Sequence, residues 1–257
     1  MIAVIGYALY EIFVLHIVDS KNIFRAILIF AGLVISFLRI KQGRTAKMVS
    51  PTQFRERYPD ILGNVFTDDR AMEKRFFKAV NLWNRNEQSS ALDAFGGMEA
   101  LCRKNDERYA VAFFKGLCYD DLHMWVKAAE QYERALTYRE NSSAASNMGI
   151  AYERLGKEDE AESAYRYAVR IDPDNEYPYN NLAQLCIRRG EYEDAADYAR
   201  QATQRNANFR QAWSALAVSC AMLGYEEDYE RAYQRAVACG ADGESLRRYI
   251  RFLTDSD

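Results

Sequence analysis

The sequence predicts an all-α protein, an α-solenoid of repeated helix pairs preceded by a transmembrane helical hairpin. Glycine recurs every 34 residues at Gly156, Gly190 and Gly224. A fixed period of this size is typical of stacked supersecondary units, each of which buries its apolar face against its neighbours. Pro is scarce, at 4 residues, and 49% of the residues are apolar, which suits helices around a buried core. Two long apolar stretches occupy the N-terminus, residues 2–18 and 23–40.

These two stretches predict a membrane anchor over residues 1–40. Each helix would span about 26 Å, at the lower end of what crosses a bilayer. The first stretch has no basic region before it and no small-residue cleavage site after it, which disfavours a cleaved signal peptide. The preferred arrangement is a hairpin with two short spans, 2–18 and 23–40. The alternative is that residues 23–40 alone cross the bilayer and residues 2–18 lie in its interface.

A basic juxtamembrane linker is predicted over residues 41–67. Basic residues beside a span stay on the cytoplasmic side, so we expect a plasma or inner membrane location with the repeats in the cytoplasm. Ser50-Pro51 is typical of a helix start and predicts a short helix over 51–58, with an irregular connector around it. Four basic side chains are expected to contact lipid headgroups and to give membrane lipid as one partner: Arg39, Lys41, Arg44 and Lys47.

The repeat domain is expected over residues 68–257. Its predicted units are about 69–105, 109–141, 142–175, 176–209 and 210–243. Residues 244–254 predict a terminal cap helix that turns Leu246, Tyr249, Ile250 and Leu253 inward.

One unit shows how the spacing encodes two antiparallel helices. In residues 142–175, the first helix is expected to end at Gly156, where glycine accepts a left-handed conformation. The second is expected over about 158–171, before Asp172-Pro173. The unit contains Met148, Gly149, Tyr152, Ala161, Tyr165, Ala168 and Pro173. This pattern resembles the tetratricopeptide repeat, W-x2-L-G-x2-Y followed by A-x3-F, A and P.

The resemblance covers about two thirds of the chain and implies a binding function. Tetratricopeptide arrays curve so that each first helix faces a concave groove, where peptides and partner proteins bind. The candidate groove residues carried onto this sequence are Phe113, Leu117, Ser146, Asn147, Ile150, Tyr177, Asn180, Asn181, Gln184, Arg188, Ser214 and Val218. Ser146 and Ile150 stand where the family's chaperone-binding branch needs polar and basic groups, which disfavours chaperone C-termini as ligands.

Composition argues against several other functions. Residues 1–58 hold 8 basic and 3 acidic side chains, whereas the rest of the chain is net acidic, which disfavours nucleic acid as a partner. The 5 cysteines form no CxxC pair and are expected to be buried free thiols. No phosphate-binding glycine loop, metal-ligand cluster or nucleophile–base set is found, so we expect no catalytic residues, no cofactor and no metal.

Three functions follow, in order of preference. The first is a non-enzymatic, membrane-tethered scaffold that binds a protein or peptide in its groove. The second is a structural subunit of a membrane assembly, held by self-association of the array and the spans. The third is an enzyme or transporter that uses Glu11 or His16 within the apolar segment. The partner's identity and the oligomeric state are left open by the sequence.

Overall fold

The computed structural model describes residues 48–63 and 65–255, and all their regular structure is helical. The predicted anchor and its four headgroup-contacting residues therefore lie outside the described residues. Two compact units are distinguished by their contacts. One includes Met48 and Asn84–Glu87, and the other contains Val49–Trp83 and Gln88–Asp257.

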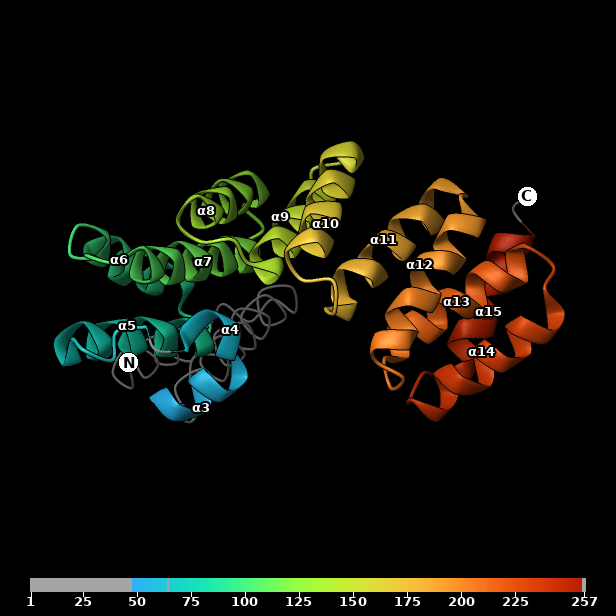
Figure 1. Ribbon diagram of the computed structural model, residues 1–257, viewed down its shortest axis with the longest axis horizontal. Coiled ribbons are helices and arrows are strands. Elements are labelled where there is room, and N and C mark those ends of the chain that lie inside the picture. The colour runs from blue at the N-terminus through green and yellow to red at the C-terminus, as the bar shows by residue number, and fades with distance from the viewer. Residues whose placement is uncertain (1–47, 64, 256–257) are drawn as a thin grey trace, which may run out of the picture. The chain divides into compact units, whose positions relative to one another are not determined.

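Thirteen helices follow one another in the described ranges, and from α5 onward they form consecutive pairs (Figure 1). They are α3 (Pro51–Arg57), α4 (Pro59–Leu62), α5 (Arg70–Asn84), α6 (Gln88–Glu99), α7 (Asn105–Asp121), α8 (Trp125–Tyr138), α9 (Ser142–Arg154), α10 (Glu158–Ile171), α11 (Glu176–Arg189), α12 (Tyr192–Arg205), α13 (Arg210–Met222), α14 (Glu226–Ala238) and α15 (Gly243–Thr254).

The turn between the two helices of each later pair is set by a left-handed residue. Gly156, Gly190 and Gly224 have φ values of +72°, +74° and +71°, as the 34-residue spacing predicts. The pair α7–α8 makes the same turn with His123 at φ +57°. A side chain in this region of φ is sterically disfavoured, so this turn is the strained member of the series.

Close contact within a pair depends on glycine facing tyrosine. A Cβ added to Gly116 would lie 2.5 Å from the Tyr132 ring, and one added to Gly149 would lie 2.5 Å from the Tyr165 ring. Both tyrosines are almost fully buried. The glycine of the first helix therefore leaves the space that the aromatic ring of the second helix fills.

The short helix predicted over 51–58 is present as α3, but the connector after it is not irregular throughout, because α4 follows at once. Ser50 forms a capping box with Gln53 and begins α3, with Pro51 in the first turn. Phe54 is fully buried, and Ile61 and Leu62 are 2% and 1% exposed. The described part of this stretch is thus folded onto the array, because its large apolar side chains complete the core beside the first helix pair.

Helix α15 packs against the end of the array. Asp242 caps it by accepting from the backbone N–H groups of Glu244 and Ser245. Leu246 and Ile250 are buried as predicted, but Tyr249 is 45% exposed. Tyr249 is therefore not an inward residue: it lies at the edge of the i, i+3, i+4, i+7 stripe, on the side away from Ile250.

The buried side chains change in kind along the chain. The N-terminal core contains seven phenylalanines from α3 to α7 and its neighbouring loops. The core around α11 to α15 contains eight alanines and no phenylalanine. A small cluster with Tyr165 and Leu182 joins α10 to α11, and another, with Tyr179 and the buried Phe209, lies among α11, α12 and the start of α13. Among the described residues, none of the helices combines the length and the apolar character that a bilayer span requires.

Candidate functional site

The candidate groove residues are all on first helices of pairs, α7, α9, α11 and α13. Their exposure divides them into three groups. Tyr177 and Arg188 are exposed. Those of intermediate exposure are Leu117, Asn147, Ile150, Asn181, Gln184 and Ser214. Those that are buried are Phe113, Ser146, Asn180 and Val218.

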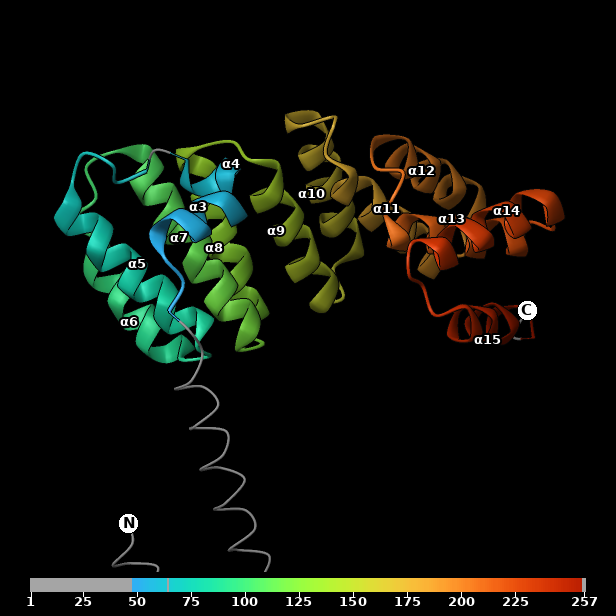
Figure 2. The same cartoon turned by 90° about the horizontal axis from the view of Figure 1, so that it is seen from below.

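The chain's own N-terminal segment covers the first part of this row. The Tyr58 ring packs edge-on against Phe114 of α7, with centroids 5.6 Å apart. Arg139 donates to the Asp60 carbonyl at 2.8 Å, and Ser143 at the start of α9 donates to the Asp60 carboxylate at 2.9 Å. Figure 2 shows α3 and α4 beside α7 and α8. Phe113 is 2% exposed, so the surface open to a ligand is that of α9, α11 and α13.

Two buried polar atoms in this row have no hydrogen-bond partner in the described structure. They are the Ser146 hydroxyl and the Asn180 side-chain carbonyl, on residues that are 5% and 8% exposed. The two residues lie 34 positions apart and so hold the same place in successive pairs. An unsatisfied buried polar group costs about 1–3 kcal/mol, and because both atoms are buried a ligand could contact them only after neighbouring side chains moved.

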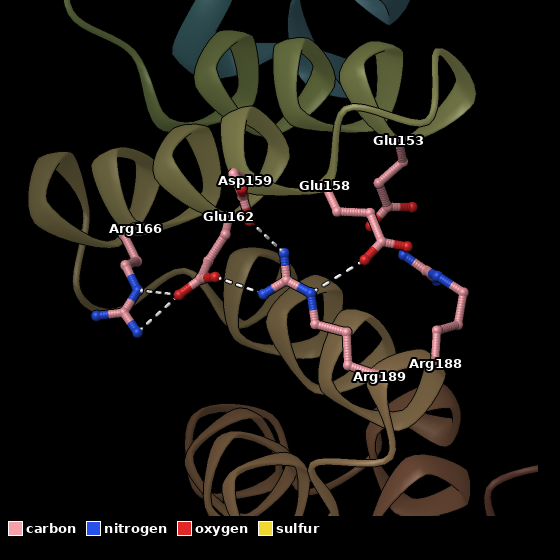
Figure 3. Close-up of polar contacts among 7 residues, drawn as sticks. All are labelled: Glu153, Glu158, Asp159, Glu162, Arg166, Arg188 and Arg189. Atoms are coloured by element: carbon pink, nitrogen blue, oxygen red, sulfur yellow. Dashed lines mark hydrogen bonds and ion pairs between the residues drawn. The ribbon is translucent and has the colours of Figure 1, made fainter.

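An ion-pair network lies beside the open end of the row (Figure 3). Arg188 of α11 pairs with Glu153 of α9 at 2.7 Å. Arg189 contacts three carboxylates of α10, those of Glu158, Asp159 and Glu162, at 3.0, 3.0 and 2.7 Å. Because Arg188 already faces Glu153, an acidic ligand would compete with an internal carboxylate. The groove therefore suits a ligand without a strong negative charge.

The surface also has a hollow, away from this row, that was not predicted from the sequence. It has a volume of about 380 Å³, is open to solvent and lies between α9 and α10. Met148 and Tyr152 line it together with Ala164 and Tyr167, whose hydroxyl donates to Glu140. Met148 and Tyr152 belong to the repeat pattern, and that pattern predicts packing within the pair but not the space left beside it.

The reactive side chains do not assemble into a site. Four of the five cysteines are buried and free, and Cys239 is partly exposed. Burial raises the pKa of Cys118 and of Cys186 to about 12, which suppresses the nucleophilic thiolate. His123 is exposed in its turn. Within residues 48–63 and 65–255, no cluster of three metal-ligating side chains is found, and Glu11 and His16 lie outside these ranges.

Helix pairs of this geometry, with a row of small and polar residues on the first helices, define an α-helical repeat array. Two models of the tetratricopeptide repeat match residues 125–176 and 154–218, so this part of the array is similar to tetratricopeptide repeats. A TPR repeat-containing protein of Methanocaldococcus jannaschii is 33% identical over 76 residues. The match covers 27% of this chain and only 13% of that relative's length.

Solved structures share the fold over a longer stretch. A tetratricopeptide repeat protein from Parabacteroides merdae covers 72% of this chain and 74% of its own, with a TM-score of 0.62 and 18% identity. MamA covers 63% of this chain and 93% of its own, with a TM-score of 0.56 and 14% identity. YrrB, described as a TPR protein with an unusual peptide-binding site, covers 73% and 96%, with a TM-score of 0.55 and 17% identity. The array therefore has the fold of these tetratricopeptide-repeat proteins.

Proposed function

We propose that this protein is a membrane-tethered scaffold that binds an extended protein segment along α9, α11 and α13. The observation that carries the binding part is the pair of amides on Asn147 and Asn181, which are half-buried on α9 and α11. They repeat at the spacing of the helix pairs, as an extended ligand contacting successive repeats would require. Each amide supplies donors and an acceptor of the kind that bind a peptide backbone.

The groove also has a composition that favours a weakly charged ligand. Tyr177 is 57% exposed and stacks edge-on with Phe209, which gives an aromatic contact surface. Glu153 neutralises Arg188. An aromatic surface beside amides suits an extended segment with apolar and neutral polar side chains. The peptide-binding site named for YrrB, which has the same fold, agrees with this assignment.

The tether is proposed from residues 1–47. Two apolar stretches, 2–18 and 23–40, are followed by a basic cluster, which is the order expected of a membrane anchor with a cytoplasmic domain after it. We place the repeats at the cytoplasmic face of a plasma or inner membrane. A scaffold of this kind would raise the concentration of its partner at the bilayer without changing it chemically.

Site-specific photo-crosslinking tests the groove. Gln184 of α11 is replaced by benzoylphenylalanine in the full chain, and irradiation is carried out in native membranes. We expect a discrete crosslinked product. The matched control places the same group at Gln204 of α12, an exposed residue on a second helix. Equal products from both positions, or none from Gln184, would remove the assignment of the groove.

Fractionation tests the tether separately. The full chain should sediment with membranes and resist extraction with high salt, while detergent should release it. Light scattering of the detergent-solubilised chain then examines self-association, the mode expected of a structural subunit. A chain that stays in the supernatant after cell lysis would overturn the tether and leave the groove assignment to its own experiment.

A further inference from the structure

We infer that the turn between α7 and α8 contacts lipid and lies against the bilayer that holds the N-terminal anchor. This apolar turn consists of Leu122, Met124 and Val126, which are 37%, 39% and 56% exposed. The inference rests on the proposed tether and extends it from residues 1–47 to the folded array. It concerns an edge of the array and not its groove.

The contacts of α5 and α7 place the apolar turn close to the point where the N-terminal residues join the array. The Val49 N–H donates to the Asn81 side-chain oxygen at 2.9 Å, and the Asn81 amide donates back to the Val49 carbonyl at 3.1 Å. Two residues further along α5, the Trp83 indole donates to Asp121 at 2.7 Å. Leu122 follows Asp121 directly. A span ending near residue 40 would therefore bring this edge of the array to the membrane surface.

The charge of this turn differs from that of the equivalent turns further along. The first turns of α10, α12 and α14 contain acidic side chains, which a helix N-terminus favours through its dipole. The first turn of α8 contains none, and Lys127 is exposed there. The Arg154 guanidinium lies 5.9 Å from the centroid of the Trp125 ring. Asp121 ends α7 just before the turn, so Lys127 and Arg154 offset a carboxylate there, and anionic headgroups repel this turn less than the acidic ones.

The side chains also suit a shallow interfacial contact. Trp125 is half-buried beside the exposed residues, and tryptophan is enriched where a protein meets the headgroup region. Exposed apolar side chains flanked by Lys and Arg are the composition of segments that lie in the interface. A protein partner would explain the apolar side chains, but three of them in one turn beside the start of the described chain at Val49 favour the bilayer that the proposed anchor would hold.

Depth-sensitive fluorescence on the full chain tests the inference. Val126→Cys is labelled with an environment-sensitive dye in a Cys239→Ser background, in which the four remaining cysteines are buried. The chain is reconstituted into phosphatidylcholine–phosphatidylglycerol vesicles that contain nitroxide-labelled lipid. Tyr225→Cys, in the turn before α14, is the reference, since Tyr225 is 49% exposed. Met124→Cys is a second labelling position if Val126→Cys does not fold.

We expect lipid nitroxides to quench the dye at position 126 severalfold more than the dye at position 225. Equal quenching on a chain that floats with the vesicles would overturn the inference and leave the tether intact. A dye at 126 shielded from both lipid nitroxide and aqueous iodide would show that residues 1–47 or a second copy of the chain covers the turn, and would also overturn it. A chain that does not float would overturn the tether and the lipid contact together.

Discussion

The helix pairs at the two ends of the array have the same geometry but are held together by different side chains. The N-terminal pairs and α3–α4 surround a core with seven phenylalanines. The pairs from α11 onward meet mainly through alanines. Large rings contribute more buried apolar area per residue, and paired rings add about 0.5–1.5 kcal/mol beyond that area. The comparison indicates that the N-terminal region is the rigid base of the array and that the open groove lies on its more thinly packed part.

Among the changes that test this comparison, Phe76→Ala is expected to lower the free energy of unfolding most. Phe76 is fully buried and has ring contacts with Phe66, Phe77, Phe95 and Phe114 at 4.8 to 5.6 Å. Its loss should cost about 3–5 kcal/mol through the transfer free energy and the cavity left behind. Hydrogen exchange measured helix by helix should show the loss of protection in α5–α7, because repeats unfold in neighbouring units.

Leu216→Ala is the matched change in the alanine-rich region. Leu216 is 7% exposed and lines an open hollow, so its replacement should cost about 2 kcal/mol, at the low end for such changes. Its effect should be confined to α13 and its neighbours. If Phe76→Ala cost no more than Leu216→Ala, the N-terminal region would not be the more stable of the two.

The contrast between the regions was only partly predictable from the sequence. The 34-residue spacing predicted the turns at Gly156, Gly190 and Gly224, because each position needs a left-handed residue. The turn at His123 breaks that pattern and gave no glycine signal. Residues 49–67 also follow no repeat, so nothing in their order indicated that Phe54, Ile61 and Leu62 would complete the core.

The sequence predicted that the candidate residues lie in one row along the first helices, but not which of them are exposed. Periodicity assigned the right helices, since positions 34 residues apart occupy the same place in successive pairs. It could not show that α3 and α4 cover the first part of the row, because that contact joins Asp60 to Ser143 across 83 residues. It also could not show that Asn147 is half-buried whereas Asn180 is only 8% exposed. Burial depends on the neighbouring pair and not on the local pattern.

Glycine substitutions test whether close packing within a pair matters more than helix propensity. Gly149→Ala should cost about 1–3 kcal/mol, because the new Cβ would lie 2.5 Å from the buried Tyr165 ring. Gly97→Ala is the control: it is also helical, but a Cβ there meets nothing within 4 Å. That change should stabilise by about 0.5–1 kcal/mol. Urea unfolding monitored by circular dichroism measures both, and changes of the same sign would contradict the packing argument.

Asp120 and Glu153 hold equivalent positions in neighbouring helix pairs, but their carboxylates have different surroundings. Asp120 accepts a hydrogen bond from Tyr132, and burial raises its pKa from 3.8 to about 6. The folded state therefore favours the protonated acid. The stability that this protonated acid contributes is fully present below the unfolded pKa and is lost as the pH rises through about 6. Asp120→Asn should stabilise the chain by about 1–2 kcal/mol at neutral pH, after allowance for partial exposure.

Thermal unfolding at acidic and neutral pH measures this change. The gain from Asp120→Asn should shrink as the pH falls below the Asp120 pKa of about 6, where the wild-type acid is protonated too. Glu153→Gln is the comparison, because Glu153 holds the matching place in the next pair but pairs with Arg188. It should bring no gain at neutral pH. A pH-independent gain from Asp120→Asn would rule out the protonation argument.

The smallest expected effect concerns the junction at which the two regions meet. In the described structure a small apolar cluster with Tyr165 and Leu182 joins α10 to α11, and Arg189 of α11 also reaches three carboxylates of α10. Arg189→Gln should cost about 1 kcal/mol, because a network on one guanidinium exceeds a single surface pair. Arg166→Gln is the control, since its side chain is 62% exposed and pairs with Glu162 inside α10. It should cost about 0.3–0.5 kcal/mol.

Salt separates the role of this junction from that of the cores. Raising the ionic strength from about 0.1 M to about 1 M shortens the Debye length from roughly 10 Å to 3 Å. The cost of Arg189→Gln, measured from urea midpoints, should therefore fall towards that of Arg166→Gln. Hydrogen exchange in the turn before α11 should rise in Arg189→Gln and not in Arg166→Gln. A cost that salt does not change would mean that Arg189 contributes by packing its aliphatic stem, so that the two regions meet through apolar contact after all.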